Sequence, residues 1–252
     1  MKHLLLTMAL ATAVCSTAFA QKGVKNVYAS SPKIDVQLIQ NSEQTVQLNR
    51  YFFEGYNTLC LPMSLTTEQL GDLRIERLAG IHQEGNTLNL YFVDCTEDGI
   101  QAGVPYLVFS PKAQYLRVKN TEALSLSDDL KAVRLSDGNG NTVTFGSSWE
   151  TVENADRYGI PAQQDVTPLE SVLIRTDGKQ FLPTRCGFTW DQQAASAKSL
   201  NIVHAGNMGV VTAIAGITLD NSSSDLYDLQ GRKASKASKG ILIQEGKKVV
   251  VK

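Results

Sequence analysis

Short apolar segments, broken by Gly, Asn, Asp and Pro, dominate the chain after its first twenty residues. Residues 34–39 alternate between apolar and polar, and residues 74–78 and 87–93 flank a Gln-Glu-Gly-Asn sequence at 83–86. Alternation with a period of two is typical of β-strands, and a short connection with Gly is typical of a hairpin. The pattern therefore predicts a mainly β fold with a β-sandwich-like body and a small C-terminal β module.

Helix signals are confined to two segments. Residues 64–70 contain two candidate caps, Thr66 and Thr67, and are followed by a stop signal at Gly71. Residues 191–200 begin with Asp and have a helix-forming composition, although their amphipathicity is weak. We therefore expect one or two short helices in the body.

Residues 1–20 have the three parts of a cleavable secretory signal peptide. Lys2 and His3 precede an apolar stretch of 11 residues at 4–14, and Ala18-Phe19-Ala20 is a small-x-small cleavage site before Gln21. As a helix this stretch spans about 16 Å, against roughly 30 Å for the hydrocarbon core of a bilayer. The sequence thus predicts export from the cytoplasm.

The rival interpretation of the N-terminus is a lipoprotein signal cut before Cys15. The residues ahead of it, Thr12-Ala13-Val14, match the usual Leu-Ala-Gly type of approach poorly. No later stretch reaches about 18 uninterrupted apolar residues, so we expect a protein that does not span a membrane.

A composition change near residue 216 suggests a boundary. We expect a body at 21–215, as one domain or two subdomains, and a linker at 216–224 that ends in a small polar run. Residues 225–252 then hold about three short strand-like segments around a polar basic loop at 230–239. This C-terminal segment is the predicted small β module.

Charge is distributed unevenly between the body and this module. Residues 230–252 carry seven basic residues against Glu245 alone, whereas residues 21–229 carry 16 basic and 24 acidic residues. The basic tail fits either solvated edge strands, on which Lys discourages aggregation, or a docking surface. The mature chain has no basic excess overall, so we expect no binding to nucleic acid.

Three cysteines remain after the signal peptide: Cys60, Cys95 and Cys186. An exported protein can form disulfides, and Cys60 and Cys95 both have strand-like flanks. Cys60 and Cys95 are the pair that we expect to be linked if a disulfide forms. Buried free thiols are an interpretation of at least equal weight, since Cys packs well as a small hydrophobe. No two cysteines have the C-x-x-C spacing of a zinc or redox motif.

No group of residues in the sequence has the spacing of a known catalytic or metal site. The mature chain has two histidines, His82 and His204, and neither has an obvious partner nearby. Residues 137–141 superficially resemble a calcium loop but lack its closing Glu, so a hairpin turn is predicted. Acidic residues lie near two aromatic side chains without any pair standing out: Glu150, Glu153, Asp156, Asp165 and Glu170, beside Trp149 and Tyr158. We expect no catalytic, cofactor or metal site, and so no enzyme.

The C-terminal module resembles a type IX (Por) secretion C-terminal sorting domain. The resemblance covers three motifs in order: Leu226-Tyr-Asp-Leu-Gln-Gly-Arg232, Lys239-Gly-Ile-Leu-Ile243 and Gly246-Lys-Lys-Val-Val-Val-Lys252. Leu242 stands where the family often has Tyr, and the loop is short. The resemblance implies recognition by outer-membrane secretion machinery through the sorting-motif residues Tyr227, Asp228, Gly231, Arg232, Gly240, Lys248 and Lys252.

A second resemblance lies in the body. Tyr56-Asn-Thr-Leu-Cys-Leu-Pro62 and Ile100-Gln-Ala-Gly-Val-Pro-Tyr-Leu107 are similar to segments of β modules in secreted and surface proteins that share this tail. Met63 replaces the Phe that is usual there. The resemblance implies architecture and no active residue.

Together these features predict an exported, non-catalytic surface or secreted β protein with a binding or structural role, whose ligand is a glycan or a protein. The periplasm is the alternative location. The alternative function is a carbohydrate-active or peptidase-like accessory enzyme with an active site assembled only in three dimensions. A subunit of a surface fibre or adhesin is a third interpretation.

Overall fold

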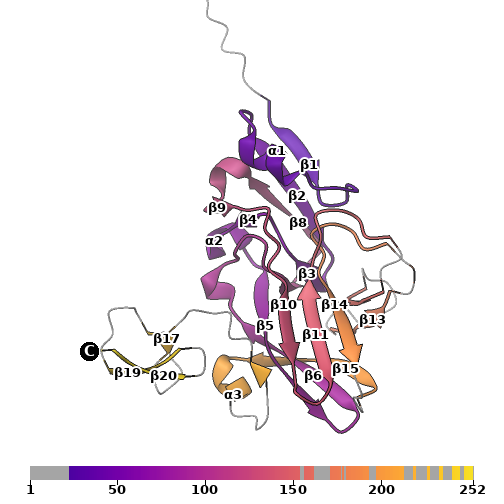
Figure 1. The fold of residues 1–252 in the computed structure, drawn as a ribbon. Coiled ribbons are helices and arrows are strands. Elements are labelled where there is room, and N and C mark those ends of the chain that lie inside the picture. Colours follow the sequence, from indigo (N-terminus) through magenta and orange to yellow (C-terminus); the bar gives the residue numbers. More distant parts are fainter. Residues whose placement is uncertain are drawn as a thin grey trace, which may run out of the picture.

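A computed structural model of the chain describes residues 23–153, 156–161, 171–176, 178, 180–192 and 197–212, and the backbone of five later strands. The fold is mainly β, as predicted, and its helical elements are short (Figure 1). In the described part of the chain these elements are α1 (Val36–Asn41), α2 (Thr67–Leu70), α3 (Met208–Thr212), η1 (Thr96–Asp98) and η2 (Asn120–Glu122). None of the described helices is both long and apolar enough to cross a membrane.

The central sheet has six strands and is built around the predicted hairpin. In this hairpin β5 is antiparallel to β6, whose other side pairs in parallel with β15. The strand order is β15 (Ser199–Gly206), β6 (Thr87–Asp94), β5 (Arg74–Glu84), β7 (Tyr106–Ser110) and β3 (Gly55–Leu59), with β16 (Thr218–Leu219) also paired to β5.

One face of the central sheet packs against a second, five-stranded sheet. The Phe92 ring of β6 lies 5.7 Å from that of Phe145 and 6.1 Å from that of Phe188, and the last two stack at 4.4 Å. Two sheets packed face to face over buried aromatic residues form the predicted β-sandwich. The order in the second sheet is β10 (Val133–Ser136), β11 (Asn141–Gly146), β14 (Gly187–Gln192), β12 (Tyr158–Gly159) and β13 (Ile174–Arg175).

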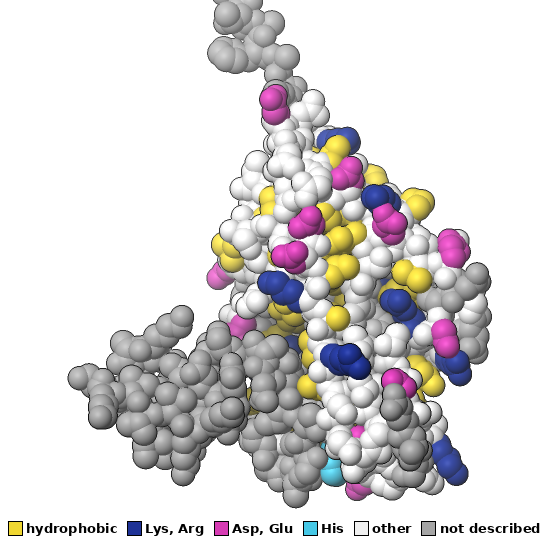
Figure 2. Space-filling view, in the orientation of Figure 1, with side chains coloured by type: hydrophobic (Ala, Val, Ile, Leu, Met, Phe, Trp, Pro, Cys, Tyr) yellow, Lys and Arg dark blue, Asp and Glu magenta, His cyan; other side chains and the backbone are white. Residues whose placement is uncertain are grey.

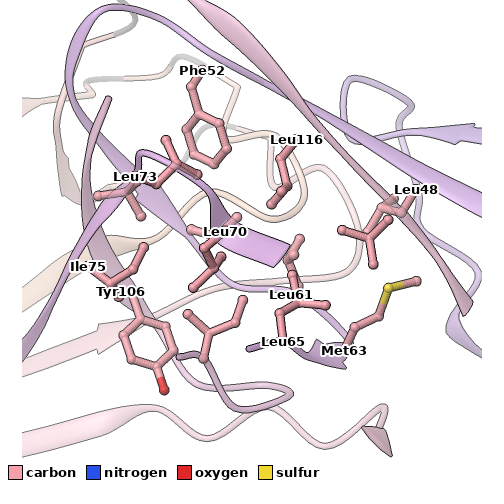
Figure 3. Close-up of a cluster of buried hydrophobic side chains, with 14 of the residues drawn as sticks. Leu48, Phe52, Leu61, Met63, Leu65, Leu70, Leu73, Ile75, Tyr106 and Leu116 are labelled. Carbon is pink, nitrogen blue, oxygen red and sulfur yellow. The ribbon is translucent and has the colours of Figure 1, made fainter. Parts of the chain in front are cut away.

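The other face of the central sheet contributes to a second core. Leu107 of β7 packs in the sandwich core, whereas its neighbours Tyr106 and Val108 pack in the second core. Successive side chains of a strand point to opposite faces, so this alternation shows that the sheet is buried on both sides. Figure 3 shows the second core, where Leu48, Phe52 and Leu116 lie across from Ile75 and Tyr106.

A smaller sheet and two helices cover that second core. The smaller sheet consists of β1 (Lys25–Tyr28), β2 (Val46–Phe52) and β8 (Gln114–Lys119), and a two-stranded ladder joins β4 (Met63–Ser64) to β9 (Ser125–Leu126). Helix α2 has the predicted start and stop, because the Thr66 side chain accepts from Gln69 N, the Gln69 side chain accepts from Thr66 N, and Gly71 ends the helix.

Two predicted elements differ from the structure. Residues 34–39 contain most of α1 instead of a strand, because Asp35 caps the helix by accepting from Leu38 N and because Val36 and Ile39 share one buried helical face. The helix predicted over 191–200 is wrong. Asp191 and Gln192 instead end β14, and residues 199 and 200 begin β15.

The C-terminal module contains four described strands that pair only with one another. They are β17 (Leu226–Tyr227), β18 (Lys233–Ala234), β19 (Gly240–Gln244) and β20 (Lys247–Val251), in the order β18-β17-β19-β20. Thr218 and Leu219 of the expected linker instead pair with Ile81 and Gly80 of β5. They occupy a stretch of β5 beyond the segment that pairs with β7. The signal peptide at 1–20 lies outside the described residues.

Candidate functional site

Arg50 occupies a core-facing position of β2. Val46, Leu48 and Phe52 of this strand are buried and follow each other at every second position or at a multiple of it. Arg50 falls at the same phase of this alternation and is 5% exposed. Its guanidinium donates to Tyr51 O at 2.9 Å and to Thr58 O at 3.1 Å, while its Nε has no hydrogen-bond partner. Leaving a buried N–H group without a hydrogen-bond partner costs free energy, and no described residue provides an acceptor for this one.

Arg50 lines a cavity of about 260 Å³ between the three-stranded sheet and the segment before β14. Hereafter this is the Arg50–Arg185 cavity, after the two guanidinium groups that line it. Its walls are formed by Tyr28, Ala29, Ser30, Asn49, Arg50, Tyr51, Phe53, Tyr115, Leu182 and Arg185.

The cavity concentrates positive charge away from water. Burial, and next the charge of Arg185, lower the pKa of the Arg50 guanidinium to about 9, and burial also lowers the pKa of Arg185. No described carboxylate forms an ion pair with either arginine. Both groups remain protonated at neutral pH, so the cavity favours an anion.

Aromatic rings form the mouth of the cavity. The ring of Tyr51 lies 5.1 Å from that of Phe53 and 4.9 Å from that of Tyr115. Tyr28 and Tyr115 are 49% and 47% exposed, and the Arg117 guanidinium lies 4.8 Å from the centroid of the Tyr115 ring. On the face drawn in Figure 2, acidic and basic side chains are interspersed over the described body.

A second cluster of polar groups lies on the central sheet. Glu76 of β5 is 4% exposed, and its Oε2 lies 2.6 Å from Nδ1 of His204 on β15. The other ring nitrogen of His204, Nε2, lies 2.8 Å from Ser171 Oγ. We refer to these three residues as the Ser171–His204–Glu76 cluster.

Two further side chains hold this cluster in place. Arg74 Nε lies 3.2 Å from Glu76 Oε1, and Arg74 also donates to the Tyr56 hydroxyl at 2.6 Å. The Tyr56 ring stacks on the His204 ring with centroids 4.5 Å apart. Burial, and next the charge of Glu76, raise the pKa of Tyr56, which therefore stays a neutral phenol.

The sequence-predicted disulfide is not formed. Cys60, Cys95 and Cys186 are all free and buried. The Cys60 thiol contacts Cys186 instead, because Cys60 N donates to Thr184 O at 2.9 Å and so joins the two segments. Cys95 packs in the other core. Strand-like flanks had suggested the pair Cys60–Cys95, but flanks do not show which strands become neighbours.

Among the described residues, the acidic side chains noted in the sequence are not brought together as a catalytic pair. Asp156 binds Arg175 at 2.8 and 3.0 Å, Glu150 pairs with Lys33, and Glu153 accepts from Gln180 at 2.9 Å. Asp165 and Glu170 lie outside the described residues.

The aromatic residues and the turn have local roles. The Nε1 of Trp149 donates to Asp128 O at 2.7 Å, and that of Trp190 donates to Asn141 Oδ1 at 3.1 Å. Asp137 Oδ1 accepts from Asn139 N and Asn141 N, which closes the predicted hairpin turn between β10 and β11.

Of the sorting-motif residues, the backbone of three is described. Tyr227 pairs with Lys233 and Ile243, Gly240 pairs with Val251, and Lys248 pairs with Ile243. The other four, Asp228, Gly231, Arg232 and Lys252, lie outside the described residues.

Sequence reasoning missed both groups of residues described above. For Arg50 a signal existed, since a charged residue stands where the alternation of β2 demands an apolar one. For Glu76 and His204, which are 128 residues apart, no spacing pattern could have shown the contact. Comparison with protein-family models, with curated proteins and with solved structures gave no match to this chain.

Proposed function

We propose that this chain is an exported surface or secreted protein that binds an acidic glycan in the Arg50–Arg185 cavity. The observation that carries the proposal is the pair of guanidinium groups, those of Arg50 and Arg185, that line one cavity without a carboxylate counter-ion among the described residues. A ligand carboxylate in the cavity supplies the missing negative charge, although it does not reach the fully buried Nε of Arg50.

The walls of the cavity favour a sugar as the carrier of that carboxylate. An arginine fork matches the geometry of a carboxylate, and exposed aromatic rings offer flat apolar faces to the C–H groups of a sugar ring. Tyr28, which is 49% exposed, is such a ring in the cavity wall, and Arg185 provides a second guanidinium beside Arg50. The Tyr115 ring already lies under the Arg117 guanidinium, 4.8 Å from its centroid. A uronic acid residue within an oligosaccharide combines both requirements.

Calorimetric titration of the mature chain, residues 21–252, tests this proposal. A glucuronate-containing oligosaccharide should bind at least tenfold more tightly than a neutral oligosaccharide of equal length, which corresponds to about 1.4 kcal/mol. Arg185→Gln should remove most of this preference, and Tyr28→Ala should weaken both ligands by removing the stacking surface.

Arg134→Gln is the matched control, because Arg134 is exposed on β10 and does not line the cavity. It should leave both affinities unchanged. Equal affinity for the acidic and the neutral sugar, or wild-type affinity in Arg185→Gln, would overturn the proposal. Tighter binding of an acidic peptide than of the sugar would identify a protein ligand instead.

The C-terminal module is, in this proposal, a secretion and sorting signal that the outer-membrane machinery recognises. Its support is the order of the three motifs, together with four short strands that pair only among themselves. Cells producing the full chain and a chain truncated after Ser224 should differ on fractionation. The full chain should reach the surface or medium with its tail removed, and the truncated chain should stay in the periplasm. Identical periplasmic location with the tail retained would contradict sorting.

A further inference from the structure

We propose that the Ser171–His204–Glu76 cluster is a hydrolytic site that cleaves carboxylic esters, with Ser171 as nucleophile and His204 as general base. This activity goes beyond ligand binding in the Arg50–Arg185 cavity and shares no residue with it. The geometry points to it because three side chains from separate parts of the chain form one linear hydrogen-bonded series.

The order of contacts is that of an activated serine. Glu76 Oε1 lies 3.2 Å from Arg74 Nε and its Oε2 lies 2.6 Å from His204 Nδ1, so the carboxylate is placed to accept the Nδ1 proton of His204. In that tautomer Nε2 has a free lone pair. Ser171 Oγ, 2.8 Å away, donates its proton to it. A serine is made nucleophilic when its base is oriented in this way by a third group.

The two ends of the cluster, Glu76 and Ser171 with His204, differ in their exposure to solvent. The Glu76 side chain is only 6% exposed, which keeps the orienting carboxylate dry, while the His204 side chain is 31% exposed and reaches solvent. The histidine end of the cluster is therefore open to solvent, whereas the carboxylate end is not. Glu76 is a positioning residue, and so are Arg74, which holds the carboxylate, and Tyr56, which stacks on the imidazole.

The cluster contains more side chains than are needed to neutralise the charge of Glu76. Arg74 alone provides a cation for the buried Glu76, at 3.2 Å. A histidine that served only as a second partner of Glu76 would need no group on its far nitrogen. Ser171 occupies that position at hydrogen-bond distance, and the stacked Tyr56 ring fixes the imidazole plane in which both bonds are made.

The proposed reaction uses water as its only co-reactant. Ser171 Oγ attacks the ester carbonyl carbon as its proton moves to His204 Nε2, and the tetrahedral intermediate then expels the alcohol, which takes that proton. Water, deprotonated by the same nitrogen, attacks the acyl-serine. The carboxylic acid leaves, and Ser171 regains its proton. An ester fits this exposed site better than an amide, because its carbonyl carbon is more electrophilic and because an amide nitrogen cannot leave until it has been protonated.

A fluorophosphonate probe, which phosphonylates activated serines, tests the assignment on the mature chain. We expect labelling that peptide mass spectrometry locates at Ser171, together with hydrolysis of 4-nitrophenyl acetate. Ser171→Ala should abolish the labelling, and His204→Gln should lower its rate at least about 100-fold, the range expected for loss of a general base.

Ser199→Ala is the matched control, since Ser199 is also a partner in a side-chain hydrogen bond, to Thr87 Oγ1 at 3.1 Å, but has no histidine beside it. It should label like the wild type. Glu76→Asp should retain more kcat than Glu76→Gln with KM unchanged in both, a difference that a merely structural role would not produce. An unlabelled wild-type chain with a native thermal transition, or labelling that survives Ser171→Ala, would overturn the assignment.

Discussion

Single residues decide which covalent link the protein can form. The Cys60 thiol contacts Cys186, both side chains are fully buried, and Cys95 belongs to a different core. Refolding of the mature chain in a glutathione redox buffer should therefore join Cys60 to Cys186, with reduction of glutathione disulfide as the balancing step. Non-reducing peptide mapping measures the product. Cys95→Ala should leave the link intact, and a Cys60–Cys95 peptide would contradict the packing.

Gly103 is fixed by the close approach of another backbone segment. It has φ +76°, and a Cβ added there would lie 1.8 Å from Asp129 O. Gly103→Ala should lower the free energy of unfolding by about 3 kcal/mol or more, since strain and a backbone clash add. Urea denaturation measures the change.

Gly85 is the comparison for this substitution. It also has positive φ, at +56°, but a Cβ there meets nothing within 4 Å. Gly85→Ala should cost only about 1 kcal/mol, from the backbone conformation alone. Equal losses for the two variants would show that the Asp129 contact does not matter. Gly103 lies in one of the two body segments that resemble other secreted β modules, so the expected result supports an architectural role for that segment.

At the scale of elements, the sequence was informative where one local signal acted alone. The period-two alternation and short connection predicted the β5–β6 hairpin, and the caps at Thr66 and Gly71 predicted α2. The prediction from the sequence was wrong where two local signals conflicted. Residues 34–39 alternate like a strand, yet Val36 and Ile39 also have helical spacing, and the Asp35 cap decided the outcome.

The second wrong element shows tertiary pairing overriding composition. Asp191 and Gln192 looked helical, but they extend β14 by pairing with Thr142 and Asn141 of β11. Weak amphipathicity gave a helix little to bury there, whereas continuation of an existing strand added ladder hydrogen bonds. Both proposed sites also depend on contacts between residues far apart in the sequence, such as Glu76 with His204. Only Arg50 could have been noticed from the sequence, because it is a charged residue at an apolar position of β2.

The sandwich depends on aromatic contacts between its two sheets. Phe145 is fully buried, stacks on Phe188 and contacts Phe92 across the interface. Phe145→Ala should lower the free energy of unfolding by about 3–5 kcal/mol, through lost burial and a cavity. Leu124→Ala, at a position that is 66% exposed, should change it by less than about 0.5 kcal/mol. Similar denaturation midpoints for both variants would argue against a common core between the sheets.

For the whole molecule, the buried acids predict loss of stability at alkaline pH. Burial raises the pKa of the Cys95 thiol from 9.0 to about 12 and that of the Tyr106 phenol from 10.0 to about 12. At a pH between the ordinary pKa of each group and its raised pKa of about 12, the unfolded chain loses a proton that the folded chain keeps. The folded state then binds more protons than the unfolded state, so the free energy of unfolding falls as pH rises.

Urea denaturation between pH 7 and 11 measures this dependence. Each group contributes a slope of up to about 1.4 kcal/mol per pH unit above its unfolded pKa. Cys95→Ala removes one titrating group and should make the decline shallower from pH 9 upward, whatever its effect at neutral pH. The slope belongs to the folding equilibrium and does not depend on whether either proposed site is functional. If the variant and the wild type decline in parallel, Cys95 titrates at the same pH in both states and is not shielded by the core.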